Sequence, residues 1–204
     1  MSVLIGGIDE HGVYLAADKR AVNIKTRAIT SEDVMKIHQV NGHVAFGMVG
    51  NHGLTEYAWE LLQRHSSQIG KSAIEQATFY DTQDVLMDIF AGIINQYSDA
   101  IDQSPVSILL AGDNTHHGVA LARWDSINPS EWRNIPGEAG LRAVAIGPSD
   151  LSIEECNNIV RNCVNIARQM QWPLLSAFTT AIGIISVKSA SVNDKFTTWS
   201  YIAN

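Results

Sequence analysis

Short hydrophobic runs separated by turn residues dominate the start of the chain. Residues 3–8 and 13–17 are apolar over almost their full length, which is typical of buried strands. The tetrapeptide "DEHG" between them has the composition of a turn, so the two runs predict an antiparallel hairpin. A less regular segment, 21–33, follows.

The next hairpin gives the clearest local signal in the sequence. Asn41-Gly42 separates the apolar runs "VMKIHQV" and "HVAFGMVG". An Asn-Gly pair between two such runs predicts a two-residue type I′ turn, because both residues tolerate a positive φ.

Helical spacing then replaces strand spacing. Residues 52–66 place apolar side chains on one face, and 82–98 repeat apolar residues at intervals of three and four. A third helix is predicted after Ser152, because Ser152 and Glu155 form a capping-box pattern. The remaining predicted strands are at 106–112, 118–124, 142–147, 182–188 and 196–202.

The order of these elements indicates the fold class. Strands and helices occur in groups and do not alternate singly, which argues against a parallel βαβ fold. Strands that are apolar along their whole length are usually covered on both faces. We therefore expect an α+β fold, in which two antiparallel sheets pack together and carry helices on their outer faces. No repeat or linker is evident, so we expect residues 1–204 to form a single domain.

Composition excludes several classes of function. The 204 residues carry a net charge of −7 without a basic run, which disfavours nucleic-acid binding. No apolar stretch reaches the ~20 residues of a membrane helix, and no signal peptide is evident. We expect a cytoplasmic protein that binds neither nucleic acid nor membrane.

Neither the cysteines nor the histidines indicate a metal or a disulfide. Cys156 and Cys163 would lie roughly 10 Å apart on a helix, too far for a disulfide, and are expected to be core residues. The histidines lack a carboxylate or thiolate that would complete a ligand set. We expect no metal and no other cofactor.

A cluster of charge is the first sign of chemistry. Asp18, Lys19 and Arg20 end an apolar strand, and Lys36 stands inside an otherwise apolar segment. A buried lysine is costly unless it is paired. Asp18, at the end of a neighbouring strand, is the natural partner.

These residues also carry a resemblance. "GVYLAADKRAV" followed by "VMKIHQVNGHVAFGMVGN" resembles the start of proteasome β-subunits and of bacterial proteasome-like proteases, which are N-terminal nucleophile hydrolases. "SILLAGDNTHHGVALARWDS" and "AVAIGPSDLSIEE" resemble later parts of the same family. The resemblance implies the four-layer αββα sandwich of that family. Its motif positions fall on Ser2, Asp18, Arg20, Lys36 and Gly50.

The resemblance implies a catalytic role for each position. Removal of Met1 would make Ser2 the first residue, and no propeptide is expected. The α-amine, with an unperturbed pKa of about 7.7–8.0, would take the proton of the Ser2 hydroxyl. Lys36 would lower both pKa values, Asp18 would hold Lys36, and Arg20 would fix the Asp18 carboxylate. The Gly50 N–H would donate to the oxyanion.

The resemblance further implies a binding pocket and partners. The peptide would lie extended between residues 21–22 and 50–52, as an added strand. The family assembles as a homo-oligomeric ring, and an ATP-dependent unfoldase would supply it with polypeptide substrates. The side chain before the cut would contact Ala21, Val34, His38, Met48 and His52.

The sequence also departs from the family pattern. The nucleophile is serine rather than threonine, Pro148 replaces a family serine, and the aspartate and serine that support the amine have no secure counterpart. Two alternatives therefore stay open. The first alternative to a peptidase is a proteasome-fold structural subunit without activity. The second is an amidohydrolase of the same catalytic type that acts on a small acylated metabolite. The candidates for the amine-supporting role are Gln171, Ser176, Thr179 and Thr180.

Overall fold

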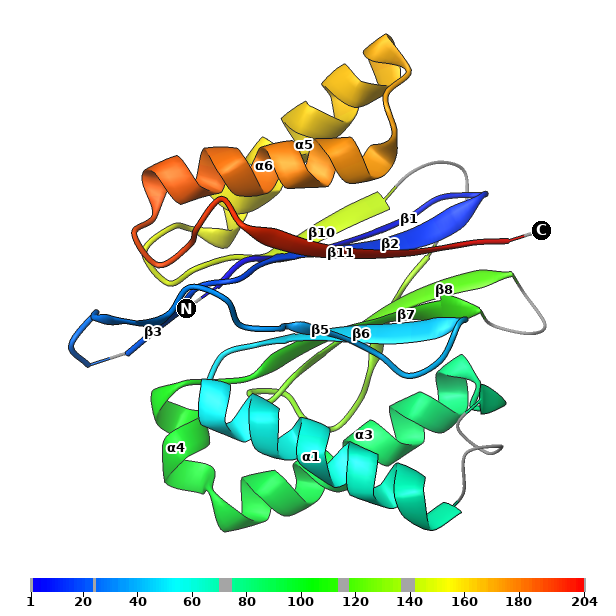
Figure 1. The fold of residues 1–204 in the computed structure, drawn as a ribbon, viewed down its shortest axis with the longest axis vertical. Helices are drawn as coiled ribbons and strands as arrows, with labels where there is room; N and C mark the ends of the chain where they lie inside the picture. Colours follow the sequence, from blue (N-terminus) through cyan, green and yellow to red (C-terminus); the bar gives the residue numbers. More distant parts are fainter. Residues whose placement is uncertain (1, 24, 70–74, 114–117, 137–141, 204) are drawn as a thin grey trace.

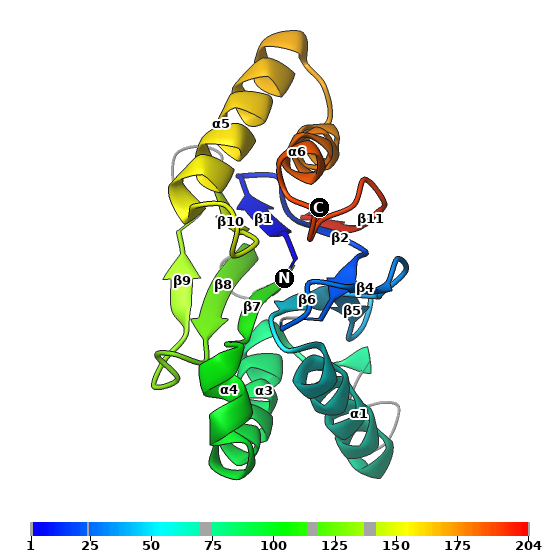
Figure 2. The ribbon, with the colours of Figure 1, turned by 90° about the vertical axis from the view of Figure 1, so that its left-hand side faces the viewer.

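The computed structural model describes residues 2–23, 25–69, 75–113, 118–136 and 142–203. They form four layers, with a sheet on a sheet in the middle and helices on both outer faces (Figures 1 and 2). The predicted αββα sandwich is confirmed. Every helix of the described part is too short or too polar to cross a membrane.

One sheet carries the start of the chain. It has four antiparallel strands, with β1 and β2 in the centre, so the first strand is covered on both edges. Helices α5 (Ile153–Met170) and α6 (Leu174–Lys188) pack on its outer face (Figure 1). Its strands, in spatial order, are β10 (Arg142–Ile146), β1 (Leu4–Ile8), β2 (Gly12–Asp18) and β11 (Phe196–Ile202).

The second sheet has five antiparallel strands and faces the first. Helices α1 (His52–Ile69) and α3 (Phe79–Gln96) cover its outer face, and the short α4 (Ser98–Gln103) follows them. The strands, in spatial order, are β5 (Ile37–Gln39), β6 (Val44–Val49), β7 (Ser107–Asp113), β8 (Val119–Asp125) and β9 (Arg133–Ile135). A small hairpin of β3 (Ala21–Val22) and β4 (Ile29–Ser31) leaves the sandwich beside the N-terminus (Figure 1).

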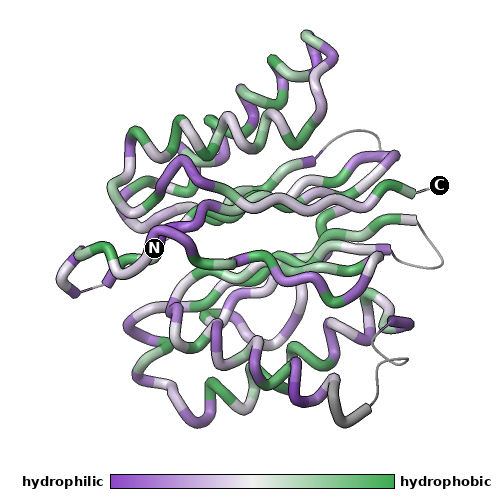
Figure 3. The backbone as a smooth tube through the Cα atoms, viewed as in Figure 1, coloured by the Kyte–Doolittle hydropathy of each residue, from purple (hydrophilic) through white to green (hydrophobic). Residues whose placement is uncertain are grey.

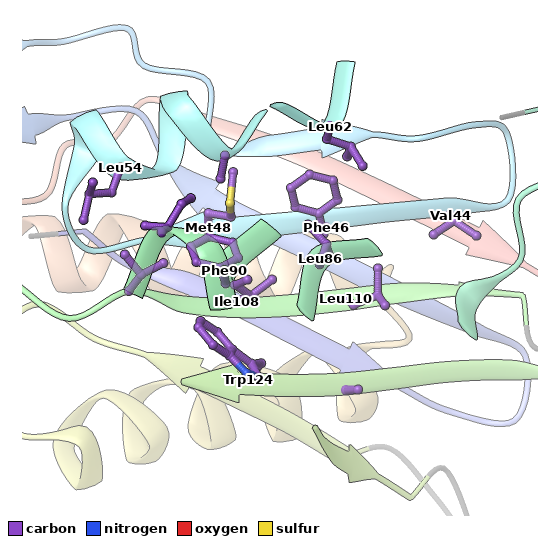
Figure 4. Packing of buried hydrophobic residues seen from close by; sticks show 14 of the residues in the cluster. Val44, Phe46, Met48, Leu54, Leu62, Leu86, Phe90, Ile108, Leu110 and Trp124 are labelled. Carbon is purple, nitrogen blue, oxygen red and sulfur yellow. The ribbon is translucent and has the colours of Figure 1, made fainter. Parts of the chain in front are cut away.

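Three hydrophobic layers hold these four structural layers together. One lies between the sheets and contains Leu4, Leu15 and Leu109. A second joins the first sheet to α5 and α6 through Phe178 and its neighbours. The third joins the second sheet to α1 and α3 and contains the aromatic cluster around Phe46 (Figure 4). Strands β1, β2, β6 and β7 are thus buried on both faces, as their uninterrupted apolar sequences predict.

Hydropathy along the backbone also marks the end of the sandwich where the site lies. Hydrophobic residues run through the strands of both sheets, whereas a hydrophilic stretch lies beside the N-terminus (Figure 3). There the ends of β1 and β2 are joined, because the Val3 N–H donates to Asp18 Oδ1 and the Asp18 N–H donates to the Val3 carbonyl.

Two local predictions are wrong. Four residues, 40–43, connect β5 to β6; the Val40 N–H donates to the Val44 carbonyl, and the Asn41 side chain accepts the His43 and Val44 N–H groups. Neither Asn41 nor Gly42 has the positive φ that a type I′ turn requires. Residues 182–188 are the end of α6 rather than a strand, because their apolar residues continue a helical period that buries Phe178, Ile182 and Ile185.

The predicted cap at Ser152 and the free, buried cysteines are both found. Ser152 caps α5, since its hydroxyl accepts the Glu155 N–H at 3.1 Å. Thr78 and Asp81 form a reciprocal capping box that starts α3 three residues earlier than predicted. Cys156 and Cys163 are free and buried, and burial raises the pKa of both thiols. The described residues contain no group of His, Cys, Asp and Glu side chains able to hold a metal.

Candidate active site

A buried ion pair lies where β2 ends. Lys36 Nζ is 2.7 Å from Asp18 Oδ1, and the side chains are only 6% and 0% exposed. Residue 36 directly precedes β5, and Asp18 is the last residue of β2. The two sheets thus bring one member each of the pair to the same end of the sandwich.

The surroundings of Asp18 satisfy its carboxylate. Besides the Lys36 ammonium, Oδ1 accepts the Val3 N–H at 2.8 Å and Oδ2 accepts the Arg20 N–H at 2.9 Å. Both carboxylate oxygens thus have hydrogen-bond donors. Asp18 therefore anchors the first strand and the lysine at once.

Opposing effects act on the pKa of Lys36. Burial lowers its pKa, the Asp18 carboxylate raises it in opposition, and the Arg20 charge lowers it further; the net effect is a lowered pKa. The ammonium also donates to the Arg20 carbonyl at 2.7 Å. Two oxygen acceptors thus fix its position.

Ser2 meets the same carbonyl. Its hydroxyl donates to the Arg20 oxygen over 3.4 Å, a long hydrogen bond, and the residue is 7% exposed. The Ser2 hydroxyl and the Lys36 ammonium therefore converge on one backbone oxygen. A cation held beside a hydroxyl favours loss of the hydroxyl proton, because it stabilises the negative oxygen that results.

Gly50 occupies a position that requires glycine. It has a φ of +125°, and a Cβ built on it would lie 2.0 Å from the Pro105 carbonyl oxygen. Both facts exclude a side chain. The backbone directly after β6 thus packs closely against the Pro105 carbonyl.

A cavity of about 240 Å³ opens beside these groups. Ser2, Lys36 and Gly50 line it, and the five residues predicted to contact the side chain before the cut line it as well: Ala21, Val34, His38, Met48 and His52. The structure thus brings the predicted site residues together. Asp18 and Arg20 lie behind the cavity wall, where they contact Lys36.

His38 contributes an uncharged imidazole to the cavity lining. Its ring stacks on Trp59 at 4.4 Å, and burial lowers its pKa from 6.5 to about 4. Its Nδ1 atom is buried without a hydrogen-bond partner among the described residues. The imidazole is therefore uncharged near neutral pH, and together with Met48 it suits an apolar guest.

Arg20 differs from its predicted role. Its guanidinium does not reach the Asp18 carboxylate but binds Glu32 at 3.0 Å and the Ala190 carbonyl at 2.7 Å. Asn193 completes this group by donating to Glu32 Oε2 at 2.8 Å and accepting the Lys19 N–H at 3.0 Å. Arg20 thus contributes main-chain atoms to the site, while its side chain ties the site to the segment after α6.

Sequence reasoning missed this segment. Asn193 lies 174 residues from Lys19 in sequence, and no local pattern connects the two. Next to it, the buried hydroxyls of Ser189 and Ser191 both donate to Asp150 Oδ1, at 2.7 and 3.3 Å. The serine-rich stretch "KSASVND" was the available signal.

The four residues considered for support of the amine lie elsewhere. Thr179 and Thr180 donate to the Ser176 carbonyl within α6, and Gln171 ends α5 in a left-handed conformation. None of the four lines the cavity beside Ser2. The amine itself depends on the removal of residue 1, which lies outside the described residues.

Comparison with known proteins identifies the family of the chain. The family model described as "Proteasome subunit" matches residues 2–126, more than half of the chain. The chain belongs to the proteasome subunit family. The matched range includes every residue of the ion pair and cavity, and the resemblance inferred from the sequence is confirmed.

Solved structures agree with this proteasome subunit fold. The chain is similar to Anbu (ancestral beta-subunit) from Yersinia bercovieri, with 18% identity, a TM-score of 0.71, and coverage of 98% of this chain and 81% of that one. It is also similar to eukaryotic HslV from Trypanosoma brucei, with 13% identity, a TM-score of 0.59, and coverage of 97% and 98%. At these identities the likeness shows the fold alone. No curated protein sequence matches significantly.

Proposed function

We propose that this proteasome-family subunit is a peptide-bond hydrolase whose nucleophile is the hydroxyl of Ser2, after removal of Met1. The observation that supports it most is the convergence of Ser2 and Lys36 on the Arg20 carbonyl, beside a cavity that Ser2, Lys36 and Gly50 line. A decayed site would have no reason to keep a buried ammonium, which is costly to bury.

The reaction follows the chemistry of N-terminal nucleophiles. The α-amine of Ser2 takes the hydroxyl proton, and the oxygen attacks the carbonyl carbon of the scissile peptide bond. The tetrahedral oxyanion accepts a hydrogen bond from the Gly50 N–H, an interaction worth about 10²–10³ in rate in related cases. The C–N bond then breaks as the protonated α-amine of Ser2 gives its proton to the leaving amine. Water hydrolyses the resulting ester and regenerates Ser2.

The role of Lys36 is electrostatic. Its ammonium, held by Asp18 and the Arg20 carbonyl, lowers the pKa of the Ser2 hydroxyl and keeps the nearby amine unprotonated by like-charge repulsion. Arg20 and Asp18 act through Lys36 and are positioning residues.

The cavity supports a preference for an apolar residue before the cut. Ala21, Val34 and Met48 supply apolar walls, and the neutral His38 ring that also lines the cavity is compatible with an aliphatic or an aromatic side chain. An extended substrate would run alongside β3 and the residues after β6 and would add a strand there.

The decisive experiment combines intact mass and peptide turnover. Protein from its native host should lack the mass of Met1 and should hydrolyse internally quenched peptides with an apolar residue before the cut. Ser2→Ala should abolish turnover, whereas Ser66→Ala, an α1 position outside the cavity, should not.

The same experiment separates the alternatives. Retained Met1 with no turnover would favour a structural subunit. Turnover of small acylated amides but not of peptides would favour an amidohydrolase.

We further propose that the subunits assemble as a homo-oligomeric ring in the cytoplasm and receive unfolded polypeptides from an ATP-dependent unfoldase. Family membership and the likeness to HslV support this proposal. A serine nucleophile in an open cavity requires such confinement to spare folded proteins. Electron microscopy of the purified protein should show closed rings, and a monomer in solution at micromolar concentration would contradict the proposal.

A further inference from the structure

A second cavity adjoins Ser2 and is lined mainly by residues that do not line the first. It has a volume of about 370 Å³ and shares Ser2, Val49 and Gly50 with the first cavity. A chain that passes the Ser2 hydroxyl in extended form and fills the first cavity with the residue before the cut would place the following residue in the second.

The walls of the second cavity are charged. Ser107, Arg123, Asp125 and Arg133 line it, all from neighbouring strands of the second sheet. The strand register places Ser107 opposite Asp125 and Arg123 opposite Arg133. Leu121, two residues before Arg123, belongs to the core between the sheets, so this face of the sheet is turned toward the first sheet.

Asp125 is already neutralised. Its two oxygens accept Arg123 Nε at 2.8 Å and Arg123 Nη2 at 3.0 Å, and the Ser107 hydroxyl donates to the same carboxylate. This bidentate pair leaves the carboxylate little capacity to bind another cation.

Arg133 is the unbalanced charge. Its side chain is exposed, and no ion pair of the described residues includes it. It also stands directly opposite another arginine on the paired strand, an arrangement that destabilises a sheet. A locally unfavourable charge that lines a cavity beside a nucleophile is typical of a binding residue.

We infer that this cavity binds the residue that follows the cut bond and that Arg133 selects an acidic side chain there, aspartate or glutamate. The inference depends on the proposed peptidase function, since it assigns the leaving-group side of the same site. A carboxylate in the cavity would face Arg133 directly and Arg123 at the edge of its pair with Asp125. A lysine in the same place would meet an uncompensated positive charge.

The first test uses the full-length assembled protein and three internally quenched peptides. They share an apolar residue before the cut and carry Glu, Gln or Lys after it, with the cut bond verified by mass spectrometry. We expect kcat/KM to be about five-fold higher for Glu than for Gln, which corresponds to roughly 1 kcal/mol, and lowest for Lys. Equal rates for Glu and Gln would overturn the inference.

Variants of Arg133 test whether this residue causes the preference for Glu after the cut. Arg133→Gln should remove the preference, so that the Glu and Gln peptides turn over at equal rates, and Arg133→Glu should reverse it in favour of Lys. The control Arg161→Gln changes an exposed arginine on α5 that lines neither cavity. A Glu preference that survives in Arg133→Gln would overturn the inference.

A binding measurement distinguishes failure of the pocket from failure of the peptidase. If the protein cleaves none of the peptides, the proposed function fails, and fluorescence anisotropy with the Ser2→Ala protein then decides on the pocket. About five-fold tighter binding of the Glu peptide, lost in Ser2→Ala/Arg133→Gln, would support the cavity as an acidic-residue site. Equal or undetectable binding of the Glu and Gln peptides would overturn it.

Discussion

Lys36 and Asp18 form a buried ion pair with 2.7 Å between Nζ and Oδ1, and the pair joins the two sheets at the end where Ser2 lies. Because both side chains are buried, removing one member leaves the other charge buried and uncompensated. The pair is therefore best tested by comparing each single change with the double change.

We predict that Lys36→Met and Asp18→Asn each lower the free energy of unfolding by about 3 kcal/mol, whereas the double variant loses only about 1 kcal/mol. The double variant contains no buried charge, and the amide oxygen introduced by Asp18→Asn can still accept the Val3 N–H. Urea unfolding measures the stabilities. Stability losses that simply add would contradict the coupling.

The same three variants separate stability from chemistry. Since the proposed mechanism needs the ammonium itself, all three should lose at least about 100-fold in peptide turnover, including the stable double variant. Activity that returns together with stability in the double variant would show that Lys36 has a structural role only.

Gly50→Ala should be among the most damaging small substitutions in the chain. Its φ of +125° and the Pro105 carbonyl 2.0 Å from a built Cβ force the backbone to move, which we expect to cost at least about 2 kcal/mol and most of the activity. The control is Gly92→Ala in α3, where a Cβ meets nothing within 4 Å. That change should stabilise the protein by about 0.5–1 kcal/mol, because alanine is the better helix former. Equal thermal stability of the two variants would contradict the role assigned to Gly50.

Asn193 should affect the site from a distance. Asn193→Ala removes the acceptor for the Lys19 N–H and the donor to Glu32, so we expect a loss of about 1–2 kcal/mol and lower turnover, because residues 19–20 carry the carbonyl that binds Lys36. Asn158→Ala, an exposed change on α5, should stay within about 0.5 kcal/mol. Turnover that equals wild type in Asn193→Ala would show that this segment does not position the site.

The isosteric Asn193→Asp variant adds a dependence on pH. In the wild type, hydrogen bonds from Asn193 and Arg20 lower the pKa of Glu32. A carboxylate at position 193 would instead repel Glu32 and raise its pKa. A raised carboxyl pKa destabilises the protein while the group is ionised, so stability relative to wild type should recover as pH falls from 7 toward 4. Melting temperatures across this range would measure the effect, and a difference that grows at low pH would contradict it.

The part of the site that the sequence predicted is local. Asp18 and Lys36 stand at the ends of strands in neighbouring hairpins, so strand period and the cost of a buried lysine predicted their pairing. Gly50 was predicted from the family resemblance. The cavity residues were predicted from the family resemblance alone. The two-residue turn was wrong because the Asn41 side chain satisfies the backbone of a longer turn, a competition that the dipeptide alone does not show.

The part that the sequence did not predict depends on distant contacts. The Arg20 guanidinium had a carboxylate two residues away, yet it binds Glu32 and Ala190, because backbone N–H groups and Lys36 already satisfy Asp18. The charge of the second cavity arises in the same way. Arg123 and Arg133 become neighbours only through the pairing of β8 with β9, a short strand that the hydrophobic pattern did not predict.

His38 gives the last prediction, a loss of stability in mild acid. Burial holds its pKa at about 4 in the folded protein, against 6.5 for an ordinary histidine. Between these values the unfolded chain binds a proton that the folded protein excludes, so stability is full above pH 6.5 and falls as the pH drops toward 4. From pH 7.5 to 5 this histidine alone should cost about 2 kcal/mol. His38→Leu, which cannot titrate, should show a correspondingly flatter dependence, whereas His65→Gln, an exposed change on α1, should follow the wild type. Urea unfolding at fixed protein concentration measures the difference between the two pH values. Parallel losses in wild type and His38→Leu would show that the imidazole is protonated, and hence solvated, in the folded state. That result would contradict the uncharged imidazole assigned to the cavity.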